Sequence, residues 1–341
     1  MKPIYDYTLK ELQNYCVDHG FKKFNGRQIF EWIYKKNVQK VDEMSNLSKP
    51  LRSHLSTHLN FSSLELVSRQ ISADKTEKFL FKLHDGHVIE TVLMRHNYGN
   101  SVCVTSQVGC NMGCSFCASG LYKKKRDLTS GEMVNQILTV KGIVNERISH
   151  VVIMGIGEPF ENYDQTLAFI DTINSPFGLE IGARHITVST SGIVPKIYEF
   201  ASESKQVNLA ISLHAPNDVL RTKIMKINKV YPIKELLKAV EVYIEKTNRR
   251  VTFEYILLKG VNDSLKYANQ LAELLNGINC YVNLIRYNAV EEFDYEGSTE
   301  SQAKAFHDRL MERHIQATLR REKGSDIDAA CGQLRSKNLK S

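Results

Sequence analysis

The chain of 341 residues lacks the features of a secreted or membrane protein. No apolar run approaches the length of a membrane span, and the first residues, Met-Lys-Pro-Ile-Tyr-Asp-Tyr, lack the apolar core of a signal peptide. Its seven cysteines are too few and too unevenly placed for a secreted disulfide framework. Internal repeats and low-complexity segments are also absent. We therefore expect a cytoplasmic globular protein with no membrane association.

Composition is ordinary, with 42% apolar and 24% charged residues, but the net charge of +7 is unevenly distributed. The first basic cluster is interleaved with aromatic residues and consists of Lys22, Lys23, Arg27, Lys35, Lys36 and Lys40. A second cluster is the tetrabasic run 123–126. Such clusters suit a phosphate backbone, although any one of them is equally consistent with a solvated helix face.

Three cysteines, Cys110, Cys114 and Cys117, share one short loop, and a fourth, Cys331, lies far along the chain. The C-x3-C-x2-C spacing suits three irons of a four-iron cluster and leaves the fourth iron open to a small molecule. Structural zinc is normally closed by four ligands, but the loop contains no histidine, and Cys103 lies on a strand-like segment. A ferredoxin-type cluster also needs a fourth thiolate. The spacing therefore favours a reactive, incompletely ligated cluster.

The hydrophobic pattern divides the chain into regions. Helical periodicity extends from residue 1 to about 70, and a hairpin with its turn at Asp85-Gly86 follows. Strands are then expected at 101–107, 149–154, 185–190, 207–213, 251–257 and 280–286, with a further one at 316–320. Helices are expected at 130–145, 163–174, 232–246, 264–276 and 299–313. Such alternation predicts a parallel sheet, open or closed into a barrel or part of one.

The sequence motifs resemble those of a known family. The cysteine loop, the turn Met154-Gly-Ile-Gly-Glu-Pro and the segment Gly324-Ser-Asp-Ile-Asp-Ala-Ala-Cys-Gly-Gln-Leu334 resemble the RlmN and Cfr group of radical S-adenosylmethionine (SAM) RNA methyltransferases. The resemblance covers nearly the whole chain. It implies an α/β fold: a partial (βα)6 radical-SAM barrel at 101–335, an RNA-contacting N-terminal helical domain at 1–72, a β-hairpin extension at 73–100 and a basic tail at 336–341. The implied cofactors are SAM and a [4Fe-4S] cluster held by the three loop cysteines.

The resemblance also assigns catalytic roles. Carbon 2 of adenine is electron-poor and cannot attack the methyl group of SAM, whereas a carbon radical adds to it. Cys331 matches the residue that carries the methyl group as S-methylcysteine, and Cys103 matches the resolving cysteine that forms a transient disulfide with it. Glu90 matches the proton acceptor. Without the resemblance, Glu90 reads as an exposed strand carboxylate and Cys103 as a small buried residue. Two SAM molecules would be used per turnover.

Polar residues at the ends of the expected strands match the family's SAM contacts, because barrel enzymes gather their active-site groups there. These residues are Gly157, Glu158, Ser189, Ser212, Leu213, His214 and Asn288. Taken singly, each is more often a capping or core-satisfied group. Cys16 and Cys280 match no family position and are interpreted as buried structural thiols.

The implied substrates are adenosine in 23S rRNA at the peptidyl-transferase centre and the tRNA adenosine 3′ of the anticodon, with flavodoxin as one reductant and a monomer as the assembly. Arg286-Tyr287-Asn288 and Met225-Lys226 depart from RlmN, the first toward Cfr, which methylates carbon 8 and protects ribosomes from antibiotics. The N-terminal region and the segment 320–326 favour carbon 2. A non-enzymatic iron–sulfur RNA-binding protein and a radical-SAM activase that acts on protein are competing hypotheses.

Overall fold

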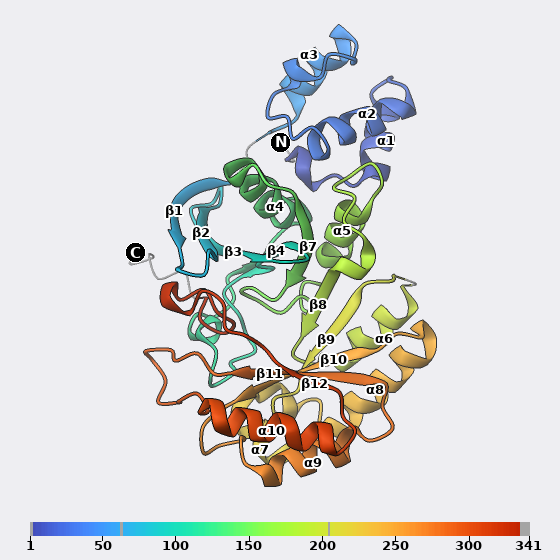
Figure 1. The fold of residues 1–341 in the computed structure, drawn as a ribbon. Coiled ribbons are helices and arrows are strands. Elements are labelled where there is room, and N and C mark those ends of the chain that lie inside the picture. Colours follow the sequence, from blue (N-terminus) through green and yellow to red (C-terminus); the bar gives the residue numbers. More distant parts are fainter. Residues whose placement is uncertain (1–2, 62–63, 204, 335–341) are drawn as a thin grey trace.

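The structure, a computed structural model, describes residues 3–61, 64–203 and 205–334 (Figure 1). The basic tail expected at 336–341 lies outside these residues. A ten-stranded sheet has the spatial order β1-β2-β3-β4-β7-β8-β9-β10-β11-β12. Its strands are β1 (Glu65–Ile71), β2 (Glu77–Lys82), β3 (Val88–His96), β4 (Gly99–Cys103), β7 (Ile148–Ile153), β8 (Ile186–Thr190), β9 (Asn208–Ser212), β10 (Val251–Leu257), β11 (Cys280–Arg286) and β12 (Ala317–Leu319).

The sheet changes character at β4. Strands β1 to β4 pair in antiparallel fashion, whereas every pairing from β4–β7 to β11–β12 is parallel. Helices lie on the outside of the curved parallel part (Figure 1). They are α4 (Ser130–Val144), α5 (Tyr163–Asn174), α6 (Val194–Ser202), α7 (Asp218–Ile224), α8 (Ile233–Thr247), α9 (Leu265–Leu275) and α10 (Glu300–Glu312). The predicted α/β partial barrel with its hairpin extension is confirmed.

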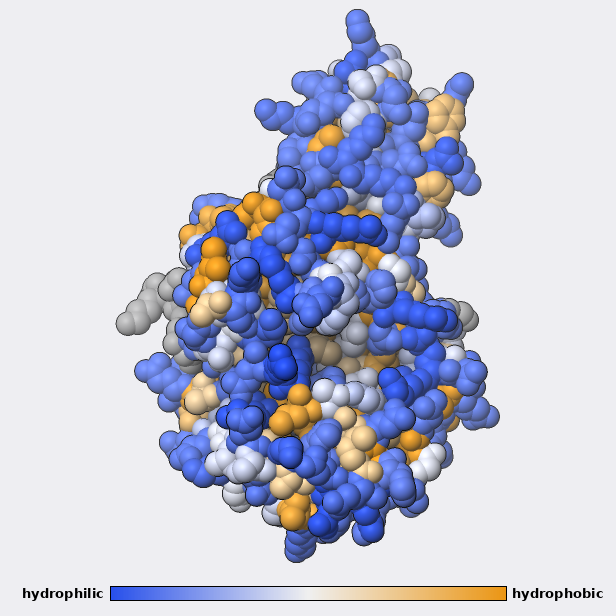
Figure 2. Space-filling view, viewed as in Figure 1, coloured by the Kyte–Doolittle hydropathy of each residue, from blue (hydrophilic) through white to orange (hydrophobic). Residues whose placement is uncertain are grey.

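Three helices, α1 (Leu9–Asp18), α2 (Lys23–Tyr34) and α3 (Lys49–His58), form the predicted N-terminal helical region beyond α4 and α5 (Figure 1). Thr8 and Glu11 form a capping box that starts α1. The face that this region shows to solvent is mainly hydrophilic (Figure 2). Its junction with the barrel is tight, because a side chain on Gly131 at the start of α4 would collide with the backbone of Tyr5.

Four elements differ from the prediction. Strand β1 was not predicted, because nearly all of its residues are exposed and the apolar alternation that identifies a half-buried strand is missing. The nine-residue α6 and seven-residue α7 were also missed, since each is shorter than the helical repeats that periodicity detects. The strand expected at 101–107 ends at Cys103, and residues 107–108 form a separate short strand, β5 (Gln107–Val108), paired with β6 (Arg126–Asp127).

None of the helices in the described ranges is both long and apolar enough to span a membrane.

A buried side-chain amide on α4 holds the backbone of the residues that leave β4 and lead to the cysteine loop. Gln136 is fully buried, and its Oε1 accepts from the backbone N–H of Thr105 (2.9 Å) and from the hydroxyl of Thr91 on β3 (2.8 Å). Its Nε2 donates to the Thr105 carbonyl at 2.9 Å. One side chain therefore provides hydrogen-bond partners for both the N–H and the carbonyl of Thr105, which lies beyond the end of β4.

Replacing this amide should destabilise the barrel. Gln136→Leu keeps the approximate volume but leaves buried groups of Thr105 and Thr91 without their partner, so we expect a loss of about 2–5 kcal/mol in the free energy of unfolding. Chemical denaturation followed by circular dichroism measures this change. Val219→Ala, at a position that is 86% exposed, should change it by less than about 0.5 kcal/mol. Equal stability of the two variants would contradict the assignment.

Candidate active site

The cysteine loop is held in place by backbone hydrogen bonds on several sides. The N–H of Cys110 donates to the Tyr122 carbonyl (2.9 Å), and the N–H of Ser115 donates to the Ile224 carbonyl at the end of α7 (3.0 Å). Gly109 has a φ of +78°, and a Cβ there would lie 2.5 Å from the Lys123 carbonyl oxygen. Glycine is therefore required where the loop begins, because the basic run 123–126 passes directly behind it.

All three loop cysteines line one cavity of about 870 Å³ at the carboxyl ends of the parallel strands. Burial raises the pKa of the Cys110 thiol to about 12 and also raises the pKa values of Cys114 and Cys117. Thiolates that are unfavourable alone become favourable when they bind a metal centre. The donor set therefore fits an iron–sulfur cluster, with Cys110, Cys114 and Cys117 as the residues that would hold it.

Glu158 lines the same cavity, and two backbone N–H groups hold its carboxylate in place. One oxygen accepts from the N–H of Ser191 (2.7 Å) and the other from the N–H of Phe160 (3.0 Å). Burial raises its pKa, and these N–H groups partly oppose that shift. Gly157 has a φ of +110°, and a Cβ there would lie 2.7 Å from the Gln107 side chain. Glycine is thus required here by packing against β5.

Of the other residues predicted to contact SAM, some line this cavity and others do not. Ser189 and Ser212 line the cavity, as does His214. Leu213 is fully buried and is not among the lining residues, so it can contribute only through the backbone it shares with its neighbours. Asn288 lines a neighbouring cavity, where Cys331 also lies.

The hydrogen bonds of His214 show that its ring is neutral and that Nε2 is a hydrogen-bond donor. Its Nδ1 accepts from the N–H of Ile256 at 3.1 Å, so Nε2 carries the proton. Burial, together with the nearby Arg221, lowers its pKa to about 3. The residue has a φ of +56°, held by the Asn262 amide, which donates to its carbonyl at 2.9 Å. This left-handed backbone turns the ring toward the cavity at the end of β9.

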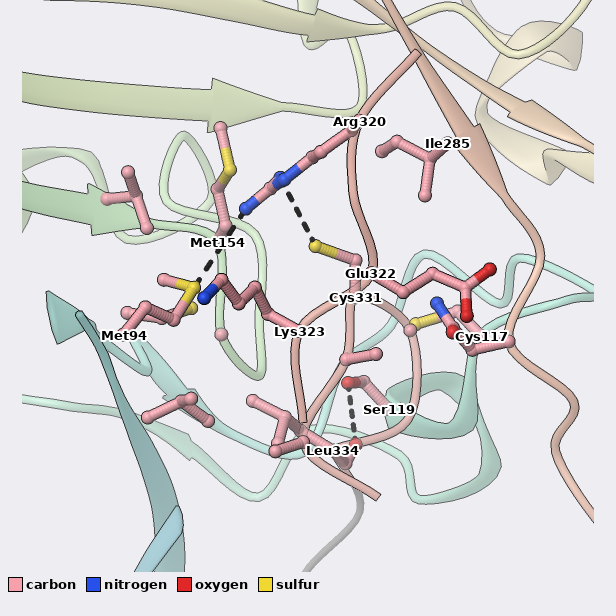
Figure 3. Close-up of a pocket in the computed structure, with 18 of the residues that line it drawn as sticks. Met94, Cys117, Ser119, Met154, Ile285, Arg320, Glu322, Lys323, Cys331 and Leu334 are labelled. Atoms are coloured by element: carbon pink, nitrogen blue, oxygen red, sulfur yellow. Dashed lines mark hydrogen bonds between the residues drawn. The ribbon is translucent and has the colours of Figure 1, made fainter. Parts of the chain in front are cut away.

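The neighbouring cavity, of about 700 Å³, is lined by both thiols of the predicted pair, Cys103 and Cys331. Figure 3 shows Cys331 in it. Cys331 lies on the wall between the two cavities and lines both, together with Cys117. Cys103, at the end of β4, lines only the neighbouring one. The structure therefore brings Cys331 between the cysteine loop and Cys103.

The segment that carries Cys331 is fixed at both ends. Near its start, the side chain of Asp326 accepts from the Ser72 hydroxyl (2.5 Å) and from the N–H of Ala73 (3.1 Å). Near its end, the N–H of Ala118 donates to the Gly332 carbonyl at 2.8 Å. The Ser119 hydroxyl donates to the Leu334 carbonyl at 3.0 Å (Figure 3). These last two bonds join the segment directly to the residues that follow Cys117.

Glu90 is buried, with 5% of its surface exposed, and not on an exposed strand face. Glu90, Val92 and Met94 are every second residue of β3, so they lie on the same face of the strand. Val92 and Met94 line the Cys331 cavity. Lys78 Nζ lies 3.6 Å from Glu90 Oε1 and also donates to the Asp328 carbonyl at 3.2 Å. The carboxylate is therefore coupled to the Cys331 segment, although it is not among the residues that line the cavity.

Two arginines that the sequence analysis did not predict as site residues contact the site. Arg320 directs Nη1 at the Cys331 sulfur, 3.6 Å away (Figure 3). Arg221 is fully buried and donates to the carbonyls of Ser191 (2.6 Å), Ser212 (3.0 Å) and Leu213 (3.1 Å). It thereby joins the loops after β8 and β9. No sequence signal identifies Arg221, because an arginine on a short helix normally indicates a surface.

Cys16 and Cys280 lie outside these cavities. Cys16 is fully buried in the N-terminal helical core, and Cys280 is partly buried at the start of β11.

The two thiols of the Cys331 cavity should differ in reactivity. Burial raises the pKa of Cys103 to about 12, so its thiolate becomes the major form only above that pH, whereas Cys331 is partly exposed beside a guanidinium. In cluster-loaded protein treated with iodoacetamide at pH 8, Cys331 should be alkylated well before Cys103. Peptide mass spectrometry measures the order. Equal rates would contradict this environment, and Cys16 is an internal control for an inert buried thiol.

Comparison with known proteins agrees with this architecture. Residues 3–60 match the ribosomal RNA large subunit methyltransferase N-terminal domain, and residues 104–271 match the radical SAM superfamily. The chain is 56% identical over 341 residues to a probable dual-specificity RNA methyltransferase RlmN of Spiroplasma citri, covering 99% of this chain and 98% of that protein. It is 55% identical over 337 residues to the Staphylococcus carnosus protein of the same name, covering 98% and 93% respectively.

A solved structure is also similar. The crystal structure of a radical SAM methyltransferase from Sphaerobacter thermophilus superposes with a TM-score of 0.94 at 44% identity, covering 98% of this chain and all of that one. Both the accessory region and the barrel are therefore shared with relatives over nearly their full length. The chain belongs to the RlmN family of radical-SAM RNA methyltransferases.

Proposed function

We propose that the enzyme methylates carbon 2 of adenosine, in 23S rRNA at the peptidyl-transferase centre and in tRNA 3′ of the anticodon, through S-methylcysteine at Cys331 and a transient disulfide with Cys103. The observation that carries the proposal is the position of Cys331, on the wall shared by the cavity of the three cysteines and the cavity that holds Cys103. The curated relatives are named as dual-specificity RNA methyltransferases, which supports two classes of RNA substrate.

When bound, the [4Fe-4S] cluster and SAM would supply the electron, the methyl group and the initiating radical, with two SAM molecules used per turnover. The cavity in which SAM would lie is lined by Glu158, Ser189, Ser212 and His214. Asn288 lines the neighbouring Cys331 cavity. The fixed carboxylate of Glu158 suits an ammonium group, and the Nε2–H of His214 suits an acceptor. These side chains would orient the ligand toward Cys331.

Side chains in and beside the Cys331 cavity divide the chemistry among them. The Cys331 sulfur attacks the methyl carbon of the first SAM, which would leave as S-adenosylhomocysteine, and the Arg320 guanidinium lies 3.6 Å from this sulfur. After the carbon bridge to adenine has formed, Glu90 accepts the proton lost from the base. Cys103 loses its own proton and attacks the Cys331 sulfur, which breaks the bond between that sulfur and the bridging carbon. The electron pair of this bond passes to the carbon, which takes up a proton and becomes the methyl group of the released base, and the two cysteines are left as a disulfide. The unpaired electron of the adduct would return to the cluster, and the external reductant would reduce the disulfide before the next turnover.

A basic cavity offers a route for RNA. It has a volume of about 2320 Å³ and shares Met94, Met154 and Arg320 with the Cys331 cavity. Cationic side chains dominate its lining: Arg95, Arg184, Arg249, Arg250, Arg320, Arg321 and Lys323, against the single carboxylate of Glu254. Such a surface suits a phosphate backbone. Because the two cavities share these lining residues, we infer that the target adenosine approaches Cys331 from this side.

The remaining expectations belong to the same proposal. Ribosomal and transfer RNA place the enzyme in the cytoplasm. Reduction of the cluster needs an electron donor such as a flavodoxin, and the enzyme is expected to act as a monomer. A Cfr-type reaction at carbon 8 is the alternative, and it rests on the sequence Arg286-Tyr287-Asn288.

The two cysteine variants should fail at different steps. With reconstituted enzyme, SAM, a reductant and RNA, Cys331→Ala should transfer no methyl group and keep its iron, whereas Cys103→Ala should accumulate RNA covalently joined to the protein. Mass spectrometry of the nucleosides measures the product against 2-methyl- and 8-methyladenosine standards. Product from Cys331→Ala would contradict the proposal. An 8-methyladenosine product would select the Cfr-type reaction, and methyl label in a polypeptide would select an activase.

RNA binding should depend on salt through the basic cavity. Arg184 is exposed at its rim, so Arg184→Ala should reduce the slope of log Kd against log salt concentration by about one. Filter binding or fluorescence anisotropy at several salt concentrations measures the slope. Arg313→Ala, which removes an arginine paired with Glu273 outside this cavity, should leave the slope unchanged. Identical slopes for both variants would place the RNA elsewhere.

A further inference from the structure

An exposed aromatic side chain lies at the basic cavity with no structural role that explains its position. Tyr98 is 67% exposed, the largest exposed fraction of any aromatic residue among the exposed large hydrophobic side chains of the described chain. It lines the basic cavity, in the turn between β3 and β4. His96 pairs with Gly99 across this turn, so only Asn97 and Tyr98 lie between the two strands. A two-residue turn fixes the backbone that carries the ring.

The ring is supported from one side. His96 stacks on Tyr98, with centroids 4.7 Å apart and planes 7° apart. His150 meets Tyr98 edge to face at 4.9 Å and itself stacks on His185 at 4.2 Å. Burial lowers the pKa values of His96 and His150, so both rings are neutral near pH 7. Lys323 and Arg320 lower the pKa of His96 further, and Asp74 opposes this shift. The result is an ordered row of rings with one broad face still open to solvent.

This row lies close to the reacting thiol. Arg320 is near enough to Tyr98 for each to affect the other's pKa, and the same guanidinium lies 3.6 Å from the Cys331 sulfur. Both Tyr98 and Arg320 line the basic cavity, while Arg320 also lines the Cys331 cavity. A nucleotide on Tyr98 would therefore lie in the basic cavity, whose lining includes the arginine that contacts Cys331.

We propose that Tyr98, backed by His96, is a stacking platform for an unpaired RNA base next to the target adenosine. This inference rests on the proposed function, because it takes RNA as the ligand of the basic cavity. A base removed from its own stack loses stacking energy, and an aromatic face restores it without regard to sequence. Cationic residues around the platform would hold the adjoining phosphates, including Arg321 and Lys323. The platform would keep the strand open while the target base is inserted.

The test uses cluster-reconstituted, full-length enzyme and an RNA hairpin with 2-aminopurine next to the target adenosine. Stacking on Tyr98 quenches this fluorophore, and Tyr98→Ala should abolish the quenching and weaken RNA binding about 10- to 100-fold. Tyr98→Phe should retain both within about threefold, because stacking needs the ring and not the hydroxyl. Met311→Ala, 47% exposed on α10, is the matched surface control and should behave as the unmodified enzyme.

The outcomes separate this proposal from the function on which it rests. Unchanged RNA affinity and quenching in Tyr98→Ala would overturn the platform even if methyl transfer proceeds. Equal losses in Tyr98→Ala and Tyr98→Phe would also overturn it, because the hydroxyl would then be responsible. If no variant and not even the unmodified enzyme methylates the RNA, the proposed reaction fails, but the fluorescence still reports whether a base stacks on Tyr98. Thermal unfolding of each variant identifies any loss that comes from misfolding.

Discussion

The site depends on a contact between two parts of the chain that are about two hundred residues apart. The N–H of Ala118, directly after the last loop cysteine, donates to the carbonyl of Gly332, directly after Cys331. The hydroxyl of Ser119 then donates to the carbonyl of Leu334. These two bonds hold the cysteine loop and the Cys331 segment against each other. A displacement of the carboxyl-terminal segment would separate Cys331 from both the cavity of the three cysteines and Cys103.

Buried polar side chains around the site hold the neighbouring loops in the positions that this contact requires. Gln136 completes the backbone at the end of β4, and Arg221 joins the loops after β8 and β9 through their carbonyls. Buried polar groups of this kind stabilise only when all their bonds are made, so they specify one arrangement of the loops. Burial lowers the pKa of Arg221 to about 10, which still leaves it charged at neutral pH. A fixed positive charge thus lies beside the thiols that would hold a metal centre.

Sequence predicted the parallel strands because their apolar runs are continuous, and it predicted the cysteine loop because metal-ligand spacing is local. It failed where the decisive contact is distant in the chain. Arg221 looks like a surface residue until its helix packs against the strand ends, and Glu90 looks exposed until β2 and the Cys331 segment cover it. The roles of Cys103, Cys331 and Asn288 came from resemblance, since spacing alone gives no reason for them to meet. Strand β1 was missed because its exposed residues carry no burial pattern.

The central claim, that the transferred carbon passes through Cys331, is tested most directly by a single turnover with two isotopes. Enzyme first methylated with SAM bearing a trideuterated methyl group is freed of that SAM and then given unlabelled SAM, a reductant and RNA. The account predicts that the methyl group in the first RNA product carries deuterium, because its carbon was already on the protein. A first product free of deuterium would show that the carbon came directly from SAM, and would contradict the role given to Cys331.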